Sequence, residues 1–220
     1  MKTTQTGVVT KRMAGKMAMQ ERILETTDRL FYRQGIRAVG VDTIAAAVGI
    51  SKRTLYNHFP SKDELIVAYL TRRFQPISAS DAPPAEQVLA EFDRLERNFA
   101  SDGFRGCPFV NAVAELGEPT TAARSIAVAF KEQRRLWFRE LLTRLGARDP
   151  DGLATQLSLL ADGAIAAALV RGDPTMARAA REAARTLLSA AGAQLPSSTE
   201  NVAKRRVSRC PGRPRTAHRS

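Results

Sequence analysis

The fifteen residues SKRTLYNHFPSKDEL, from Ser51 to Leu65, concentrate side chains that bind phosphate groups or the edges of bases. Hydroxyl, ammonium, guanidinium, amide and imidazole groups follow one another within two helical turns. Groups of these kinds contact DNA phosphates, and they also read the donors and acceptors that base pairs present in the major groove. The stretch therefore indicates nucleic-acid binding, provided that a helix presents these side chains to a groove.

The flanking residues predict such a helix. Apolar residues at helical spacing predict a first helix that ends at Gly35 and a short second helix over residues 41–48. Gly49 breaks the second helix, Ser51 is a favourable N-cap for a third, and Pro60 closes the third. Two short helices joined by a tight turn that contains glycine form a helix-turn-helix. The predicted motif runs from about Gly40 to Phe59.

Within the third helix, the apolar residues predict which face is buried. Leu55 and Phe59 lie four residues apart and are expected to point inward, toward the first two helices. The polar residues of this helix then face outward, and the major groove of B-DNA admits one helix. Ser61 and Glu64 follow as a capping box that opens a fourth helix.

The charge of the chain gathers at its two ends. The net charge of the 220 residues is +12. Residues 1–78 hold 13 basic and 6 acidic side chains, residues 79–203 hold 14 and 16, and residues 204–220 hold 7 and none. An excess of basic residues attracts phosphate whatever the base sequence. An anionic partner is therefore expected at the ends of the chain.

Composition predicts a soluble, cytoplasmic protein. The chain is 44% hydrophobic and 25% charged, as globular domains are. Its two cysteines, Cys107 and Cys210, are too few for a disulfide framework. The N-terminus lacks the apolar segment of a signal peptide. The most apolar run, residues 157–170, is too short to span a bilayer.

Changes in composition divide the chain into four parts. We expect a flexible basic arm over residues 1–18, a helix-turn-helix domain over 19–75, a helical body over 83–193 and a disordered basic tail over 196–220. No stretch alternates convincingly as a strand does. The predicted fold class is all-α, with a three-helix head followed by a larger helical body. The expected helices of the body span residues 84–100, 107–117, 120–146, 150–171 and 174–192.

The head resembles the TetR/AcrR family of bacterial transcriptional regulators over about residues 19–70. The matching segments are RILETTDRLFYRQGIRAVGVDTIA (residues 22–45), VGISK (48–52), TLY (54–56), HF (58–59) and SKDEL (61–65). The resemblance implies a homodimer in which each subunit carries a DNA-binding head and a body that holds a small-molecule effector. Ligand binding would change the spacing of the heads and release a palindromic operator. Repression is the commoner behaviour in the family and is the expectation here.

The resemblance also implies roles for single residues of the head. Lys52, Tyr56 and Lys62 are the expected phosphate contacts, and Thr43 on the second helix is another candidate. Burial of Tyr56 in the core is the alternative, but its hydroxyl suits a phosphate better.

The remaining polar residues of the third helix are candidates for reading bases. Arg53 replaces a residue that is often smaller in the family, and it either binds guanine O6 and N7 or contacts a further phosphate. His58 is expected to pack and cap rather than to read a base. The predicted DNA-binding residues are Thr43, Ser51, Lys52, Arg53, Thr54, Tyr56, Asn57, His58 and Lys62.

The body contains a candidate thiol. Cys107 stands at a predicted helix start in GFRGCPFVNAVAEL, residues 103–116, which is similar to a stretch in one subset of the family. Some members of that subset sense electrophiles or oxidants through a cysteine in this region. A helix N-terminus lowers the pKa of a thiol, and Arg105 would add to this effect. The alternative is an inert, buried cysteine.

The body also contains a candidate ligand pocket and a candidate dimer interface. In this family the long seventh helix lines the pocket, although Trp137 on it is more often a core residue. Small residues in the last two helices allow close helix packing, with a partner subunit by resemblance or within one subunit as the alternative. The predicted pocket residues are Phe109, Val113, Phe130, Gln133, Trp137 and Ile165.

Two other classes of function compete with a regulator. An enzyme is disfavoured because the sequence shows no Ser/His/Asp set, no Gly-rich phosphate loop and only two histidines. We therefore expect no catalytic residue, no metal site and no cofactor. A non-specific nucleic-acid-binding protein would lose affinity for every DNA sequence equally as salt rises. The basic tail, with its single Gly-Arg-Pro at 212–214, would contribute to binding of that kind.

Overall fold

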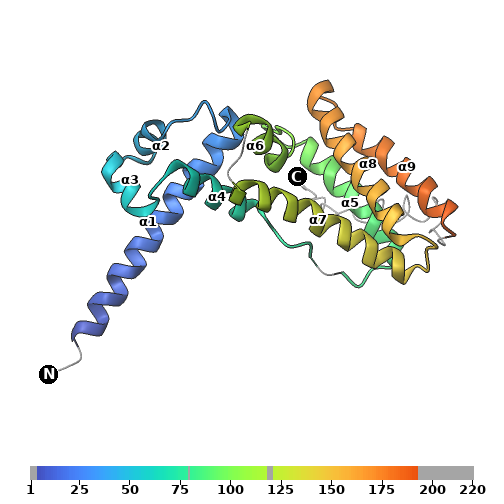
Figure 1. Cartoon of the computed structure of the whole chain (residues 1–220), viewed down its shortest axis with the longest axis horizontal. Coiled ribbons are helices and arrows are strands. Elements are labelled where there is room, and N and C mark those ends of the chain that lie inside the picture. Colours follow the sequence, from blue (N-terminus) through green and yellow to red (C-terminus); the bar gives the residue numbers. More distant parts are fainter. Residues whose placement is uncertain (1–3, 79, 118–120, 193–220) are drawn as a thin grey trace, which may run out of the picture.

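The computed structural model describes residues 4–78, 80–117 and 121–192, and within these ranges the regular structure is entirely helical (Figure 1). The all-α fold class predicted from the sequence is confirmed. The helices are α1 (Thr4–Gln34), α2 (Val41–Val48), α3 (Lys52–His58), α4 (Lys62–Arg73), α5 (Pro84–Phe99), α6 (Pro108–Leu116), α7 (Thr121–Arg144), α8 (Pro150–Arg171) and α9 (Met176–Ala190).

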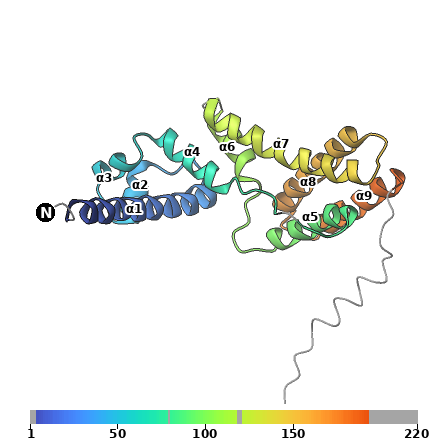
Figure 2. The same ribbon diagram turned by 90° about the horizontal axis from the view of Figure 1, so that it is seen from below.

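The molecule is elongated, with a small helical head at one end and a larger bundle at the other. Figures 1 and 2 both show α1 to α4 in the head and α5, α8 and α9 in the body, with α6 and the start of α7 between the two parts. The N-terminal half of α1 projects away from the head in Figure 1. The predicted tail, residues 196–220, lies outside the described residues.

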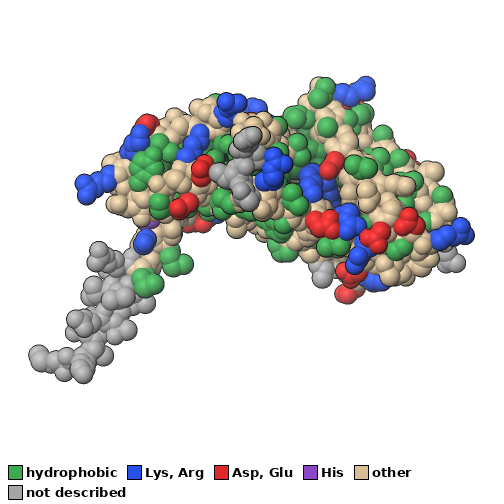
Figure 3. Space-filling view, viewed as in Figure 1, with side chains coloured by type: hydrophobic (Ala, Val, Ile, Leu, Met, Phe, Trp, Pro, Cys, Tyr) green, Lys and Arg blue, Asp and Glu red, His purple; other side chains and the backbone are tan. Residues whose placement is uncertain are grey.

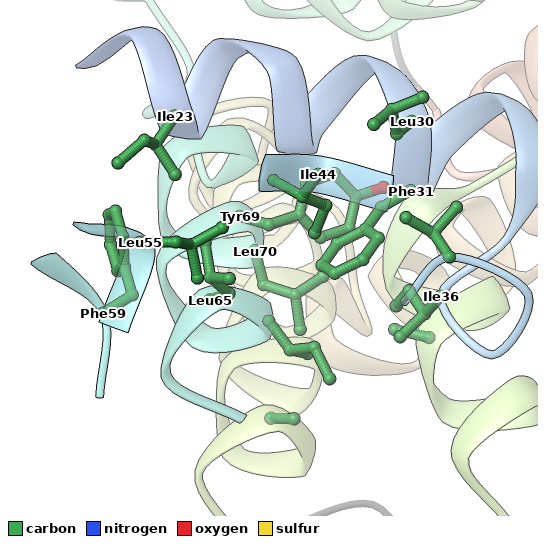
Figure 4. Close-up of a cluster of buried hydrophobic side chains, with 14 of the residues drawn as sticks. Ile23, Leu30, Phe31, Ile36, Ile44, Leu55, Phe59, Leu65, Tyr69 and Leu70 are labelled. Carbon is green, nitrogen blue, oxygen red and sulfur yellow. The ribbon is translucent and has the colours of Figure 1, made fainter. Parts of the chain in front are cut away.

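The head is held together by one apolar core. Leu55 and Ile44 are fully buried, and Phe59 is 8% exposed. Their side chains lie near those of α1 and α4 (Figure 4), where the rings of Phe31 and Tyr69 meet edge-to-face with centroids 5.6 Å apart. The predicted inward direction of Leu55 and Phe59 is confirmed, so the other side chains of α3 are left facing outward.

The start of α1 differs from the prediction. The sequence favoured a flexible arm over residues 1–18, but α1 is already helical at Thr4. Its first fifteen residues contain no proline, and Ala, Met, Lys and Gln are good helix formers. Once the packed half of a helix has formed, each further residue adds a hydrogen bond without a new nucleation cost. Two isolated glycines are not enough to stop it.

The body is a bundle of α5, α7, α8 and α9 around a second apolar core, which includes Phe92, Phe138 and Leu157. Buried alanines, among them Ala161 on α8 and Ala184 on α9, allow these two helices to lie close together. The small residues therefore serve packing within one subunit, one of the two roles that the sequence allowed. The predicted helices of the body are confirmed to within about two residues, α7 ending at Arg144.

Helix α8 is longer than the apolar run identified in the sequence. Among the described residues it is the one helix whose length and composition would allow it to cross a membrane. The core helix of a water-soluble bundle passes the same test. Here α8 packs against α5, α7 and α9 through buried residues such as Leu157 and Ala161, so we regard it as a bundle helix.

Hydrogen bonds fasten α6 to the end of α1. The Tyr32 hydroxyl donates to the carbonyl of Gly106 at 3.1 Å and accepts from the backbone N–H of Arg105 at 3.0 Å. At the other end of α6, Glu115 accepts from the backbone N–H of Arg37 at 3.1 Å. The head and the body are thus joined at both ends of α6.

Candidate functional site

The turn before α3 has the geometry expected of a helix-turn-helix. Gly49 ends α2 with a φ of 78°, a left-handed conformation that glycine adopts without strain. Ser51 caps α3, because its hydroxyl accepts from the backbone N–H of Thr54 at 3.0 Å. On the other side, Arg22 of α1 donates to the carbonyl of Val48 at 3.1 Å and fixes the end of α2. Local signals and one contact to α1 therefore orient α3.

The two residues chosen as the limits of the motif, Gly40 and Phe59, flank its helices and do not belong to them. Gly40 is the N-cap of α2 in an extended conformation, so the first helical residue is Val41. Without a side chain, Gly40 offers α2 no capping hydrogen bond, and it contributes only its carbonyl, which accepts from the N–H of Ile44 at 3.2 Å. Phe59 is the C-cap of α3. Gly40 is therefore a boundary of the motif, and the side chains that can reach DNA begin after it.

The outer face of α3 carries the predicted DNA-binding residues. Ser51, Lys52, Arg53 and Asn57 are exposed, and Tyr56 is 38% exposed. This exposure places Tyr56 on the surface and not in the core. Thr54 is half-buried, with its hydroxyl 2.9 Å from that of Ser51, and Thr43 on α2 is exposed. Figure 3 shows Lys and Arg side chains around the outer end of the head.

Lys52 forms an ion pair on the surface of the head. Its ammonium lies 3.1 Å from the carboxylate of Asp42, and both side chains are at least half exposed. Such surface ion pairs contribute about 0–1 kcal/mol, because water solvates both charges well. A DNA phosphate could therefore take the place of Asp42 at little cost.

Lys62 is placed differently from the expectation of a free phosphate contact. Its ammonium donates to the carbonyl of Ile36 at 2.7 Å and lies 5.9 Å from the centre of the Phe31 ring. Burial lowers the pKa of Lys62, while the nearby carboxylates of Asp63 and Glu115 act in the opposite direction. Lys62 therefore ties α4 to the loop after α1, and any phosphate contact would have to share this ammonium.

His58 is half-buried at the end of α3. Its Nδ1 is buried and has no hydrogen-bond partner within the described residues. This position agrees with the packing role predicted for the ring, but Nδ1 makes no capping hydrogen bond in the part of the chain that the structure describes.

A cavity of about 920 Å³ lies in the body, beside the head. Its lining comes from Asp28 of α1, the end of α4, the segment after it, and α5 to α9. At the junction with the head, Phe74 of α4 meets the stacked rings of Phe109 and Phe130, whose centroids are 3.9 Å apart. A molecule in this cavity would touch side chains directly linked to α4.

Five of the six predicted pocket residues line this cavity, and Val113 does not. Val113 lies one helical turn after Phe109 and packs, half-buried, against the same apolar core, while Val110 is exposed. Both valines line a separate surface hollow among α6, α7 and α8. The residues brought together in the cavity as predicted are Phe109, Phe130, Gln133, Trp137 and Ile165.

The sequence reasoning missed the arginines of this cavity. Arg134 on α7 is 5% exposed and lines the cavity. One signal could have found it, because Arg134 lies four residues after Phe130 and three before Trp137, on the face of α7 already assigned to the pocket. The ion-pair partners of Arg72, Arg73, Arg134 and Arg181 are far away in the sequence and could not be foreseen, whereas Arg94 pairs with Glu91 three residues before it. The arginines on the lining are Arg72, Arg73, Arg94, Arg97, Arg134 and Arg181.

Cys107 lines the same cavity and is the N-cap residue of α6. It is 7% exposed. Arg105, which was expected to assist the thiol, instead donates to the carbonyl of Arg33 at 2.6 Å. Both observations fit an inert, buried cysteine.

Comparison with known proteins agrees with this architecture. Residues 23–69 match the family model described as bacterial regulatory proteins, tetR family. The crystal structure of a TetR-type transcriptional regulator from Streptomyces avermitilis is 35% identical, covers 80% of this chain and 99% of its own, and superposes with a TM-score of 0.71. The chain belongs to the TetR family. It is therefore a DNA-binding transcriptional regulator and not an enzyme.

Two further relatives extend the comparison. The TetR-family regulator SCO4454 of Streptomyces coelicolor is 32% identical, over 79% of this chain and 95% of its own, with a TM-score of 0.70. The HTH-type transcriptional repressor KstR2 of Mycobacterium tuberculosis is 32% identical over 40% of this chain and 50% of its own length. Regulators of the TetR family bind DNA operators and typically act as homodimers.

Proposed function

We propose that this TetR-family regulator is a cytoplasmic repressor that binds a palindromic operator as a homodimer and leaves it when a small molecule occupies the cavity of the body. The observation that carries the proposal is the outward face of α3, where Lys52, Arg53, Tyr56 and Asn57 are exposed together on a helix fixed by a buried core. A relative named as a repressor supports the direction of regulation.

In this proposal the contacts divide between phosphates and bases. Lys52, Tyr56 and Thr43 bind phosphates at the groove edges, while Arg53 and Asn57 reach base edges. Ser51 contributes by capping α3, and Lys62 and His58 contribute mainly by holding the helices in place. Thr54 stands beside Ser51 as a further base-reading candidate.

The proposed dimer interface is the outer side of α8 and α9. On α8, Leu159 is 67% exposed and Val170 is 85% exposed. A shallow apolar hollow lies between the two helices, lined by Gln156, Leu159, Leu160, Ala183, Thr186 and Leu187. A two-fold dimer matches two half-sites of an operator.

The proposed route from cavity to operator runs through α4 and α6. Phe74 ends α4 and packs on Phe109 and Phe130, which line or border the cavity. A ligand that displaces these rings would move α4 and, through the shared core, α3. In a dimer, such a movement changes the distance between the two recognition helices.

Fluorescence anisotropy with the DNA upstream of the protein's own gene tests the proposal. Binding should survive an excess of unrelated DNA, with a specificity ratio of roughly 10³ or more. A chain that ends at Ala193 serves as control, because it lacks the basic segment over residues 204–220. Binding by the full chain alone, removed by competitor, would instead indicate non-specific attraction by that segment.

A further inference from the structure

We infer that the cavity of the body takes an organic anion with a flat apolar part, such as an aryl carboxylate, and that Arg134 binds its charged group. This inference rests on the proposed function, because it names the chemical class of the effector. Three features of the cavity support it: the burial of Arg134, the local balance of charges, and the arrangement of aromatic rings.

Arg134 has an unused hydrogen-bond donor in the interior. The residue is 5% exposed, and its Nε–H is buried with no hydrogen-bond partner among the described residues. Buried polar groups are nearly always hydrogen-bonded, since water is lost on burial and an unpaired donor costs stability. The side chain of Arg134 lines the cavity, and carboxylates are the acceptors that a guanidinium binds best.

The charges around Arg134 do not balance. Arg134 and Lys131 both donate to the same oxygen, Oδ1 of Asp162, the Lys131 ammonium at a distance of 2.7 Å. Two positive charges thus share one carboxylate, which leaves a net positive charge in a partly buried cluster. Four other arginines on the lining have a carboxylate each: Arg72 with Glu21, Arg73 with Asp28, Arg94 with Glu91 and Arg181 with Asp93. Arg97, the remaining one, is exposed and makes no ion pair among the described residues. Lys131 and Asp162 line the surface hollow among α6, α7 and α8 and not the cavity, so Arg134 is the member of this cluster that an anion in the cavity can reach.

The lining beside Arg134 suits a flat apolar group. Phe130, Arg134 and Trp137 follow at helical spacing on one face of α7, and all three line the cavity. The Phe130 ring is stacked on that of Phe109, with an interplanar angle of 17°. Gln133 on the same wall offers an amide to a polar edge of the ligand. An aryl group among these rings would place an attached carboxylate within reach of the guanidinium.

A purely structural ion pair between α7 and α8 is the competing explanation, and matched probes separate the two. We would titrate the protein with 4-isopropylbenzoate and with 4-isopropylbenzamide, which share an outline and differ in charge. Trp137, the single tryptophan of the chain, lines the cavity, so its fluorescence reports binding. We expect the benzoate to bind about tenfold or more tightly than the benzamide, as charged hydrogen bonds are stronger than neutral ones.

Two substitutions should shift benzoate binding in opposite directions. Arg134→Gln removes the charge and should weaken benzoate binding about tenfold or more while leaving benzamide binding unchanged. Asp162→Asn removes the competing carboxylate and should tighten benzoate binding, although it weakens the link between α7 and α8. Arg139→Gln, an exposed arginine of α7 outside the cavity lining, is the matched control and should change neither.

The proposal is overturned if the benzoate fails to bind, if both probes bind equally, or if Arg134→Gln leaves their ratio unchanged. Should Arg134→Gln fail to fold, Asp162→Asn decides, because a structural ion pair predicts no gain in benzoate affinity. Operator release is measured separately by anisotropy. If the benzoate binds through Arg134 but the operator is not released, the proposed release mechanism is wrong and the anion site stands. If the neutral amide releases the operator and the benzoate does not, the anion site is wrong and the release mechanism stands.

Discussion

At the residue scale, the hydroxyl of Tyr56 can be tested without disturbing the fold. The side chain is 38% exposed on α3. Among the described residues, its hydroxyl makes no hydrogen bond that holds the head together. We expect Tyr56→Phe to weaken operator binding by about 1 kcal/mol, roughly fivefold, through loss of one phosphate hydrogen bond. The thermal midpoint should not change. Unaltered affinity in the anisotropy assay would remove Tyr56 from the phosphate contacts.

Lys52 and Lys62 form a matched pair of cations with different predicted roles. Lys52→Met should reduce the dependence of log affinity on log salt by about one unit and leave stability unchanged, because its partner Asp42 is exposed. Lys62→Met should lower the free energy of unfolding by about 1 kcal/mol, because the Ile36 carbonyl loses its donor. Denaturant melts measure the free energy of unfolding, and salt titrations of operator binding measure the salt dependence of the affinity. Equal effects of the two substitutions on stability would contradict this division.

What the sequence predicted at this scale depended on distance along the chain. Ser51 was identified as a cap because its acceptor role involves Thr54, three residues away. Lys62 donates to the carbonyl of Ile36, which is 26 residues away in the sequence. Arg134 donates to the carboxylate of Asp162, which is 28 residues away. Such partners are set by how helices pack, which propensities and spacing do not encode.

At the scale of elements, helix ends with local signals were predicted well. Gly35 and Gly49 both adopt positive φ where the sequence placed helix ends. The predicted start of α1 is wrong, because no proline or cap marks it and residues 1–18 show no sustained helical period. Helix extension from a packed neighbour, rather than the local sequence, decides that segment.

The link between α1 and α6 gives a prediction at this scale. Tyr32→Phe removes both hydrogen bonds to Arg105 and Gly106, which connect the head to the entry of α6. We expect a loss of about 1–2 kcal/mol in stability and faster hydrogen exchange at the Arg105 amide. Tyr56→Phe is the control, since it removes the same atom from an exposed site. Unchanged exchange at Arg105 would show that other contacts hold α6.

At the scale of the whole molecule, an effector bound in one body can change operator binding only if it changes the distance between the two heads. A monomer offers no fixed distance between recognition helices, so the proposed dimer is required for the proposed release. Family membership and the fold agree with a dimer, but the outer sides of α8 and α9 are what must meet. We propose that the exposed apolar residues of α8 form part of that contact.

Leu159 lies in the hollow between α8 and α9 and is 67% exposed. Leu159→Glu would place two carboxylates at a two-fold apolar contact, where each loses water without gaining a partner. We expect a folded monomer by light scattering and a large loss of operator affinity, because one head alone binds one half-site. Leu136→Glu on α7, at a site 40% exposed and outside this hollow, should remain dimeric. A Leu159→Glu protein that stays dimeric would place the subunit contact elsewhere, and the distance between the heads would then depend on another pair of helices.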